Sequence, residues 1–337
     1  ATLTINGELD AASRIGVTTK TVPVSGAPVI IATGLSDKNY DNYRSIFFSD
    51  VTDQGFAVAR DADTLTLIVE HRHPVCGAAS CSHEGHDNDA VWLPIGSEEE
   101  LRAAAADGYY YLTKDVTLTD ERGWSPANNA HLCLNGHALI GPLTGQESIA
   151  VREGITFTLT DCGSTGTITH NSKERGSAVT NIGTFFMYGG SFTNNYLGVL
   201  NSGSMTVAGK VRITGNGMNV LLPEEGKTIA IGVGGLAAGS EIGVYVDRLQ
   251  PITEAVTIVT NASASDVGYF QNDLTGQDLD IRYADGTLIL APHQHDFGQT
   301  GVCSCGTAAE AKHNSVYYVT LEEALAAAKA GRDKTVL

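Results

Sequence analysis

The chain has 337 residues, only 18% of them charged, and a formal net charge of −17. Nucleic acid and anionic membranes repel so acidic a surface, so neither is an expected partner. The 38 glycines and the low proportion of charged residues favour β structure with many tight turns over helical bundles. No run of apolar residues is long enough to cross a bilayer, so we expect no membrane insertion.

Several segments of the chain occur twice. LDAASRIGV at residues 9–17 reappears as LAAGSEIGV at 236–244, a shift of 227 residues. HRHP from residue 71 is matched by HQH from 293, and EEELRAAAADG from 98 by EEALAAAKAG from 322. Such self-similarity predicts tandem modules. We expect the chain to start near the end of one module, contain a whole second module and stop inside a third.

The repeats divide the chain into five predicted parts. Residues 1–73 are the C-terminal part of a module, comprising its last coil and a β cap, and 74–88 are a junction rich in His and Cys. Residues 89–292 form the whole module, with a capping helix at 97–106, coils at about 109–246 and a β cap at about 247–292. Residues 293–305 are a second junction, and 306–337 begin the next module.

Two capping boxes predict the helices. Ser97 stands three residues before Glu100 at the start of a helix-forming run, and Thr320 and Glu323 repeat this spacing. In a capping box the hydroxyl accepts from the backbone three residues on, and the acidic side chain bonds back. We expect each helix to cover the open end of the coils, because bare strand edges invite further pairing.

A shorter, irregular repeat fills the whole module. HLCLNGH, TFTLTDC, TFFMYGG, SMTVAGK and TIAIGVG superpose, at spacings of 25, 28, 20 and 24 residues. Each alternates apolar and polar residues, as a strand with one buried face does. The spacing leaves room for three short strands per coil. The predicted inward residues are Leu132, Phe157, Phe185, Met205 and Ile229, followed by Leu134, Leu159, Met187, Val207 and Ile231.

Further positions recur in each coil. Ile168, Phe192 and Ile213 align with one another, as do Val179, Val199 and Val220. Asparagines recur at two turn positions, where their amides could bond from coil to coil. We expect these asparagines to be architectural rather than ligand-binding. They are Asn171, Asn195 and Asn216 at one position, and Asn181 and Asn201 at the other.

These patterns together predict an all-β fold, a right-handed parallel β-helix (solenoid). One coil cannot bury its own apolar face, but coils stacked at about 4.8 Å enclose a continuous core. The predicted module carries a short N-terminal capping helix and a small C-terminal β-rich cap, and such modules follow one another in tandem.

The coil motifs and the YYVTLEEALAAAKAG start resemble the repeat modules of large secreted surface proteins of Firmicutes, of the clostridial type. The resemblance covers essentially the whole chain through short motifs in a distinctive order. It implies tandem β modules on a bacterial cell surface, in cell-wall or adhesive molecules that are mostly of unassigned activity.

Two histidines one residue apart, followed by two cysteines, stand at both junctions. Two imidazoles and two thiolates would complete a tetrahedral zinc site. The candidate ligands are His71, His73, Cys76 and Cys81 at the first junction, with His83 and His86 as alternates, and His293, His295, Cys303 and Cys305 at the second.

Two other interpretations stay open at the junctions. A Cys76–Cys81 disulfide would close a plausible small loop, whereas geometry disfavours a Cys303–Cys305 bridge. The junctions could also be polar linkers with no site. We expect the remaining cysteines, Cys133 and Cys162, not to be direct neighbours, and to be free thiols rather than a bridge.

No catalytic residues are predicted, and no cofactor other than junction zinc. Degradation of acidic polysaccharides needs clustered carboxylates, and no two carboxylates occupy matching positions on stacked coils. There is also no GxSxG motif, phosphate loop or dinucleotide fingerprint. Aromatic residues such as Phe186 could instead contact sugars.

The sequence therefore predicts a non-catalytic, structural or adhesive protein of the bacterial cell surface or extracellular space. We expect a fibre or filament whose partners are neighbouring modules, or copies of itself, joined head to tail. The alternative is a surface protein that binds or degrades glycans, with host or bacterial surface glycans as partners.

Overall fold

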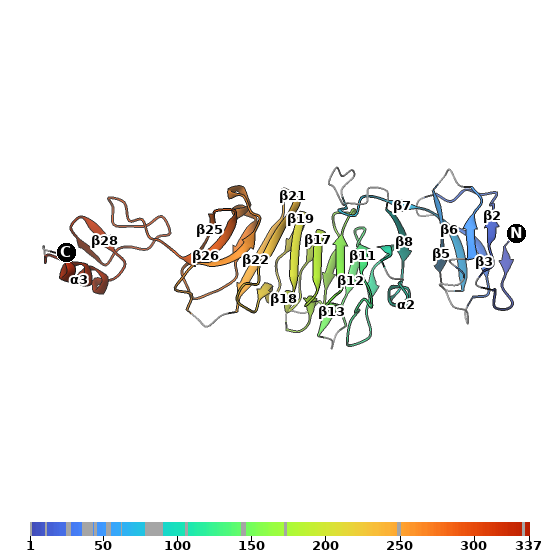
Figure 1. The fold of residues 1–337 in the computed structure, drawn as a ribbon, viewed down its shortest axis with the longest axis horizontal. Helices are drawn as coiled ribbons and strands as arrows, with labels where there is room; N and C mark the ends of the chain where they lie inside the picture. The colour runs from blue at the N-terminus through green and yellow to red at the C-terminus, as the bar shows by residue number, and fades with distance from the viewer. Residues whose placement is uncertain are drawn as a thin grey trace.

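The computed structural model describes the chain except for residues 1, 11, 25–27, 36–42, 44–45, 52–54, 62, 78–89, 105–106, 143–145, 172–173, 248–250 and 332–333. It is rich in strands, with few helices, and one large sheet is mostly parallel. The elements follow one another along the long axis in chain order, with the two termini at opposite ends (Figure 1). None of the described helices is long and apolar enough to cross a membrane.

Parallel pairing runs through the large sheet as three ladders, in which strands about one coil apart in the chain pair with each other. We call a coil the stretch from one strand of the first ladder to the next. The first ladder consists of β8 (Val91–Ile95), β9 (Tyr109–Leu112), β11 (Ala130–Cys133), β14 (Thr156–Thr160), β17 (Thr184–Phe192), β19 (Ser204–Ile213), β21 (Ile229–Leu236) and β23 (Val256–Thr260).

The second ladder shares the long strands β17 and β19 with the first ladder, and the third ladder ends on β22 (Glu241–Val246), which also belongs to the second. The second consists of β10 (Val116–Thr117), β12 (Ala138–Ile140), β15 (Thr167–Thr169), the C-terminal halves of β17 and β19, β22 and β24 (Phe270–Asn272). The third consists of β13 (Glu147–Val151), β16 (Ser177–Asn181), β18 (Leu197–Asn201), β20 (Met218–Leu222) and the C-terminal half of β22.

The predicted register holds for most coils and fails at one. Phe185 pairs with Phe157 on one side and Met205 on the other, and Met205 pairs with Ile229, as the alternation indicates. The pairing expected between Leu132 and Phe157 was wrong, because Leu132 pairs with Leu159. A slip of two residues keeps every side chain on its face, so alternation alone cannot detect it.

The core lies between the ladders. Phe157, Phe185 and Phe192 are fully buried, and the rings of Phe157 and Phe185 stack with centroids 5.8 Å apart and an interplanar angle of 11°. Burying one such side chain contributes about 1.5–3 kcal/mol. Because each coil covers the next, this core continues from α2 (Glu98–Arg102) to β26 (Thr287–Pro292).

The turn asparagines form two arrangements of hydrogen bonds. The Asn181 amide donates to Asn201 Oδ1 at 2.8 Å. At the other position, Asn195 donates to Asn216 Oδ1 through its side chain at 2.9 Å. The predicted third member, Asn171, is not part of this chain of bonds. Its place is taken by His170, whose backbone N–H donates to Asn195 Oδ1 at 2.8 Å.

This second arrangement runs in one direction and ends on a carboxylate. The Asn216 amide donates to Asn219 Oδ1 at 2.9 Å, and Asn219 donates through its backbone and side chain to Asp273 at 2.9–3.0 Å. A carboxylate only accepts, so Asp273 is a fitting last member. Burial raises the pKa of Asp273.

The helix before the coils is shorter than predicted. It spans Glu98–Arg102 rather than 97–106, and residues 105–106 lie outside the described part. The Ser97 hydroxyl accepts from the backbone of Glu100, but the Glu100 carboxylate accepts from Gly96. The later helix, α3 (Leu321–Ala330), has the full capping box of Thr320 and Glu323.

The strands of the two β caps pair in the same way. β23 and β25 (Leu279–Ala284) flank β26, as β3 (Val29–Thr33) and β5 (Phe56–Asp61) flank β6 (Thr64–Val69). Both caps carry a register shift at the equivalent place, between Thr257 and Val259 and between Ile30 and Ala32. The remaining elements are β1 (Leu3–Thr4), β2 (Ile15–Val17), β4 (Phe47–Ser49), β7 (His71–Arg72), η1 (Ala264–Tyr269), β27 (Ala311–His313) and β28 (Val316–Tyr318).

Candidate metal centres

Two groups of histidines and cysteines have side chains close enough to hold a metal ion. Each contributes four donor atoms, one per residue, that lie within 4.8 Å of one another. We call His71, His73, Cys133 and Cys162 the first His/Cys group. We call His293, His295, Cys303 and Cys305 the second His/Cys group.

The second His/Cys group contains all four residues that the sequence singled out at the second junction. His293 and His295 follow directly after β26, and their rings meet edge to face with centroids 4.6 Å apart. His293 Nε2 lies 3.4 Å from Cys303 Sγ, and His295 Nδ1 lies 3.4 Å from Cys305 Sγ. The fold therefore brings both thiols to the two rings.

In each histidine of the second group, the ring nitrogen that does not face a thiol lies close to a carboxylate. His293 Nδ1 lies 2.6 Å from Asp280 Oδ2, and His295 Nε2 lies 3.3 Å from Asp278 Oδ2. A carboxylate behind a histidine orients the ring and raises its basicity as a metal ligand. Neither aspartate was predicted from the sequence. Asp280 lies in β25, which pairs with β26, and Asp278 directly precedes β25, so only that pairing could have identified them.

The charges of the second group are complementary. The backbone N–H of Cys305, and then the two imidazoles, lower the pKa of Cys303 to about 5. The Cys303 thiolate, and then Asp280, raise the pKa of His293 to about 9. Imidazolium and thiolate thus face each other, and a metal ion would displace the protons from the rings.

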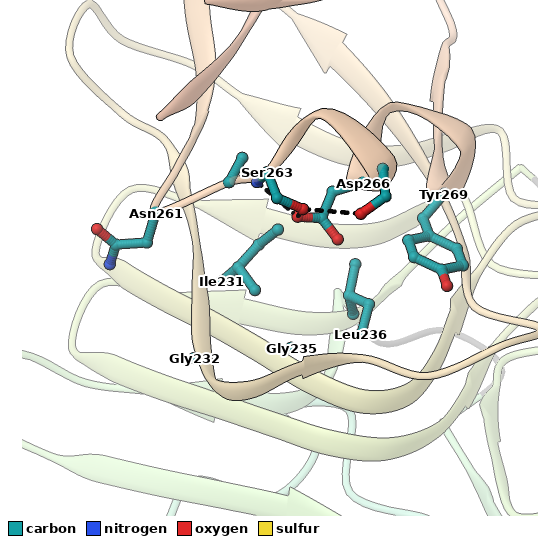
Figure 2. A pocket seen from close by; sticks show the side chains of 10 residues that line it. Ile231, Gly232, Gly235, Leu236, Asn261, Ser263, Asp266 and Tyr269 are labelled. Carbon is teal, nitrogen blue, oxygen red and sulfur yellow. Dashed lines mark hydrogen bonds between the residues drawn. The ribbon is translucent and has the colours of Figure 1, made fainter. Parts of the chain in front are cut away.

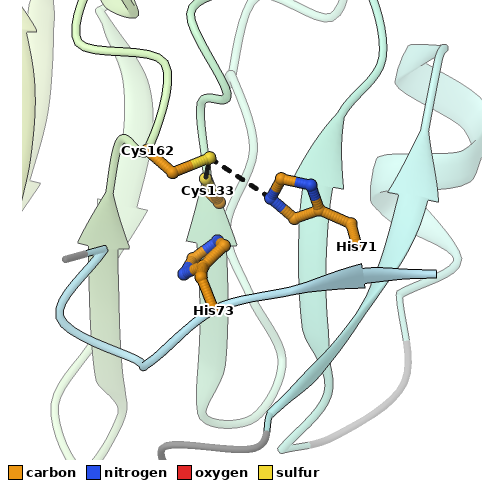
Figure 3. Close-up of side chains that lie close together, drawn as sticks. All are labelled: His71, His73, Cys133 and Cys162. Atoms are coloured by element: carbon orange, nitrogen blue, oxygen red, sulfur yellow. Dashed lines mark hydrogen bonds between the residues drawn. The ribbon is translucent and has the colours of Figure 1, made fainter. Parts of the chain in front are cut away.

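The first His/Cys group combines the predicted histidines with the two cysteines of the coils (Figure 3). Cys133 ends β11 and Cys162 follows the adjacent strand β14. Their sulfur atoms are 3.4 Å apart, so the expectation that they are not neighbours was wrong. It followed from the two-residue error in register. Cys162 Sγ also lies 3.2 Å from His71 Nε2.

His73 offers an unused nitrogen to this group. Its side chain is only 8% exposed, and its Nδ1 lies 2.7 Å from the carbonyl oxygen of Pro74. That carbonyl can only accept, so in the neutral imidazole Nδ1 carries the proton and Nε2 has a free lone pair. Nε2 is buried and has no hydrogen-bond partner among the described residues. An unpaired buried acceptor is costly, and a metal ion would satisfy it.

Aromatic rings surround the first group. His71 stacks on Tyr111 with centroids 4.2 Å apart, and His73 stacks on Trp92 with centroids 4.3 Å apart. Burial raises the pKa of the Cys133 thiol, whereas its contact with Cys162, together with the nearby His71, lowers the pKa of Cys162. One thiolate is thus already favoured in a closed, largely apolar setting.

The other residues predicted at the first junction are placed differently. Cys76 is described but is not among the four donors. Cys81, His83 and His86 lie outside the described residues. The histidines instead meet cysteines that are distant in the sequence, since His71 and Cys162 are 91 positions apart. Sequence spacing gives no signal for such a pairing.

The donor atoms suit a tetrahedral site with two nitrogen and two sulfur ligands. Zinc bonds of about 2.0–2.3 Å would separate neighbouring donors by about 3.3–3.8 Å. The shortest donor separations in the two groups, 3.2–3.4 Å, lie near that range, and all donor atoms of a group lie within 4.8 Å of one another.

A hollow of about 420 Å³ lies between β21 and η1, away from both His/Cys groups (Figure 2). Asp266 is the acidic residue in its described lining, and its carboxylate accepts from the backbone and hydroxyl of Ser263. Glycoside hydrolysis needs a pair of carboxylates across the bond that breaks. The described lining offers one, and that one caps η1.

No family model, curated protein or solved structure matches this chain.

Proposed function

We propose that the chain is part of a structural, non-catalytic protein, in which tandem modules of stacked coils are joined by zinc-binding junctions. Each module would be a right-handed parallel β-helix, and residues 89–292 would be one whole module. The observation that carries the proposal is that one His/Cys group lies beside β11 and β14, near the first strands of the parallel ladder, and the other follows β26, which pairs with the last strand of that ladder, β23.

Support for the β-helix comes from the three ladders and from the shared core. Strands one coil apart pair in parallel, and crossover connections between parallel strands are right-handed in nearly all proteins. A stack of this kind adds length without adding new kinds of contact. Stiffness and regular spacing are then the function, as in a stalk, fibre or filament.

Support for zinc comes from the donor set. Soft thiolates with imidazoles select zinc over magnesium or calcium, which prefer oxygen ligands. A junction has little core of its own, so metal binding would supply much of its order. The proposed partners are neighbouring modules, or further copies of the chain, placed head to tail.

The proposed location is the bacterial cell surface or extracellular space, in line with the resemblance to clostridial-type surface repeats. Adhesion through glycans is the alternative function. One observation favours it: Phe186 and Tyr188 stack side by side on β17 with centroids 6.0 Å apart, and both are partly exposed. Aromatic faces of this kind can contact sugar rings.

The test is a metal and thiol count on protein purified without chelators, together with particle images. We expect two zinc ions per chain, four thiols (those of Cys133, Cys162, Cys303 and Cys305) that react only after chelation, and elongated particles. Metal-free protein with oxidised cysteines would contradict the zinc-binding part. Compact particles would contradict the structural part. Binding on a glycan array or release of reducing sugar would favour the alternative.

A further inference from the structure

We propose that zinc in the first His/Cys group clamps residues 1–69 onto the coil stack, whereas zinc in the second group orders only its own loop. The inference rests on the proposed zinc binding and assigns different tasks to the two sites. It follows from where the ligands come from. His71 and His73 belong to the segment after the first β cap, and Cys133 and Cys162 belong to two adjacent coils.

Residues 1–69 and the coils have separate cores. The first core is built around Ile46, Phe47 and Leu65, and it does not merge with the core of the coils. A third, small cluster lies on the outer face of the ladder and contains Trp92 and Cys133. The histidines contact this third cluster, so the first group lies where the two larger bodies meet.

The segment that carries the histidines is packed closely onto the coils. His73, Pro74 and Val75 are buried, and Trp92 Nε1 donates to the His73 carbonyl at 2.9 Å. Gly77 has a positive φ of 71°, and a Cβ there would collide with the Thr160 hydroxyl. The segment therefore crosses the ladder at a distance that only glycine permits at that point.

The burial of Cys133 is explained by the same packing. Its neighbours Leu132 and Leu134 point into the core of the coils, so alternation directs Cys133 outward. An outward residue would ordinarily be exposed, yet Cys133 is 0% exposed. The histidine segment covers it (Figure 3). Two donor atoms from the segment that follows the first β cap and two from the coils thus converge at this place.

The second group has a different construction. Its four ligands all lie within residues 293–305, and its outer carboxylates, Asp278 and Asp280, come from β25 and the residue before it. Cys305 is exposed. A metal there would close a short loop against its own β cap, with no ligand from a distant coil.

Paired variants separate the two tasks. Cys133→Ser with Cys162→Ser removes the thiolates of the first group, and Cys303→Ser with Cys305→Ser is the matched control with the same loss of two thiols. Bound zinc is measured by elemental analysis, and amide hydrogen exchange is followed at residues 71–77. Each variant should retain one zinc ion, and Co²⁺ should give tetrahedral absorption bands at the remaining site.

Only the first variant should lose protection at residues 71–77. If zinc is present at one hundred times its dissociation constant, zinc binding lowers the population of the open state, and with it the rate of amide exchange, about a hundredfold. Small-angle scattering should show a wider spread of orientations between residues 1–69 and the coils in the first variant than in the unmodified chain. The control should show no such increase.

Because Cys133 is buried, its variant could fail to fold. The second measurement therefore uses the Cys303→Ser, Cys305→Ser chain, which has only the first site, with and without a chelator. Exchange at residues 71–77 that does not change on zinc removal would overturn the clamp, as would a Cys133–Cys162 disulfide in native protein. Absence of zinc from the unmodified chain would instead overturn the zinc-binding part of the proposed function.

Discussion

His170 occupies the first place in the polar arrangement that the turn asparagines otherwise form. Its ring is 2% exposed, and Nδ1 lies 3.0 Å from Asn195 Oδ1. Nε2 is buried without a hydrogen-bond partner among the described residues. Gly141 and Gly176 make room for the ring, because a Cβ at either would collide with it. Burial lowers the pKa of His170.

We predict that His170 makes the stability of the protein depend on pH. The pKa of His170 in the folded protein is below the ordinary value of 6.5, so the stability that the neutral ring contributes is fully present at pH values above 6.5. As the pH falls, the unfolded chain binds the proton first, so this contribution is lost through the folded pKa. His170→Asn, which copies Asn195 and Asn216, should stay within about 1 kcal/mol of the parent near neutral pH.

Urea unfolding of both chains at about pH 7.5 and about pH 5.5 checks this prediction. The variant should lose less stability than the parent on acidification. Equal losses in the two chains would show that His170 titrates alike in the folded and unfolded states.

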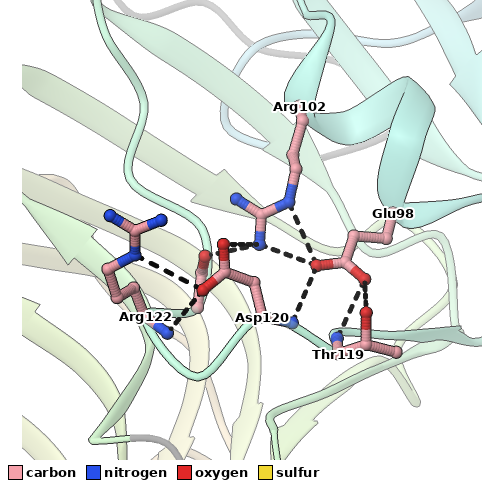
Figure 4. A network of polar contacts seen from close by, with 6 residues as sticks. Glu98, Arg102, Thr119, Asp120 and Arg122 are labelled. Carbon is pink, nitrogen blue, oxygen red and sulfur yellow. Dashed lines mark hydrogen bonds and ion pairs between the residues drawn. The ribbon is translucent and has the colours of Figure 1, made fainter.

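At the scale of elements, α2 depends on polar contacts because it is only one turn and a half long. Its Leu101 is fully buried at the end of the core. Its Glu98 carboxylate accepts from the Thr119 backbone at 2.8 Å and hydroxyl at 2.6 Å, and from Arg102 at 2.7 Å (Figure 4). Burial raises the pKa of Glu98, but these hydrogen bonds outweigh it and lower the pKa to about 2.

We predict that Glu98→Gln destabilises the protein by about 1–3 kcal/mol near neutral pH, because hydrogen bonds to a charged acceptor are lost. The folded pKa of Glu98 lies below its ordinary value of 4.5, so its contribution is present above 4.5 and is lost as the pH falls towards about 2. The difference in the free energy of unfolding between parent and variant should therefore become smaller in acid. Denaturant unfolding across this range measures it, with Glu99→Gln, an exposed acid in the same turn, as the control.

For the whole molecule, the ladders imply that a coil can be removed as a unit. Gly183 and Gly203 stand at equivalent places, since Thr184 pairs with Ser204 and a Cβ on Gly203 would contact Gly183. Joining residue 183 to residue 204 would keep the alternation and the pairing of every later strand. Repeat proteins tolerate such changes because each unit contacts only its neighbours.

We predict that deleting residues 184–203 leaves a folded, cooperative protein that is shorter by about 4.8 Å, one strand spacing. It should be less stable, because one layer of the core is lost. Small-angle scattering and denaturant unfolding give the two results. Deleting only residues 184–193 is the control, since half a coil cannot satisfy all three ladders. If both deletions behave alike, the coils are not independent units.

Much of the architecture could be predicted because it depends on local periodicity. Alternation identified the buried residues, from Phe157 to Ile229, and the spacing of Ser97 and Thr320 identified both helix starts. The helix end at Arg102 and the pairing of Leu132 with Leu159 were not predicted. Both features depend on which other segment of the chain packs against them. The alternation of apolar and polar residues is also unchanged when a strand shifts by two residues.

Some of the metal ligands could likewise be predicted from the sequence, and others could not. The second His/Cys group was evident from the sequence, because its four ligands lie within residues 293–305 and a short loop brings them together. The same pattern at the first junction indicated the histidines, His71 and His73, but not their thiols. The sequence by itself therefore determined the periodic strands, the repeat and the presence of a His pair at each junction. Only the tertiary structure decided that Cys133 and Cys162 complete the first group, because stacking the coils and crossing them with a distant segment creates contacts that no local spacing encodes.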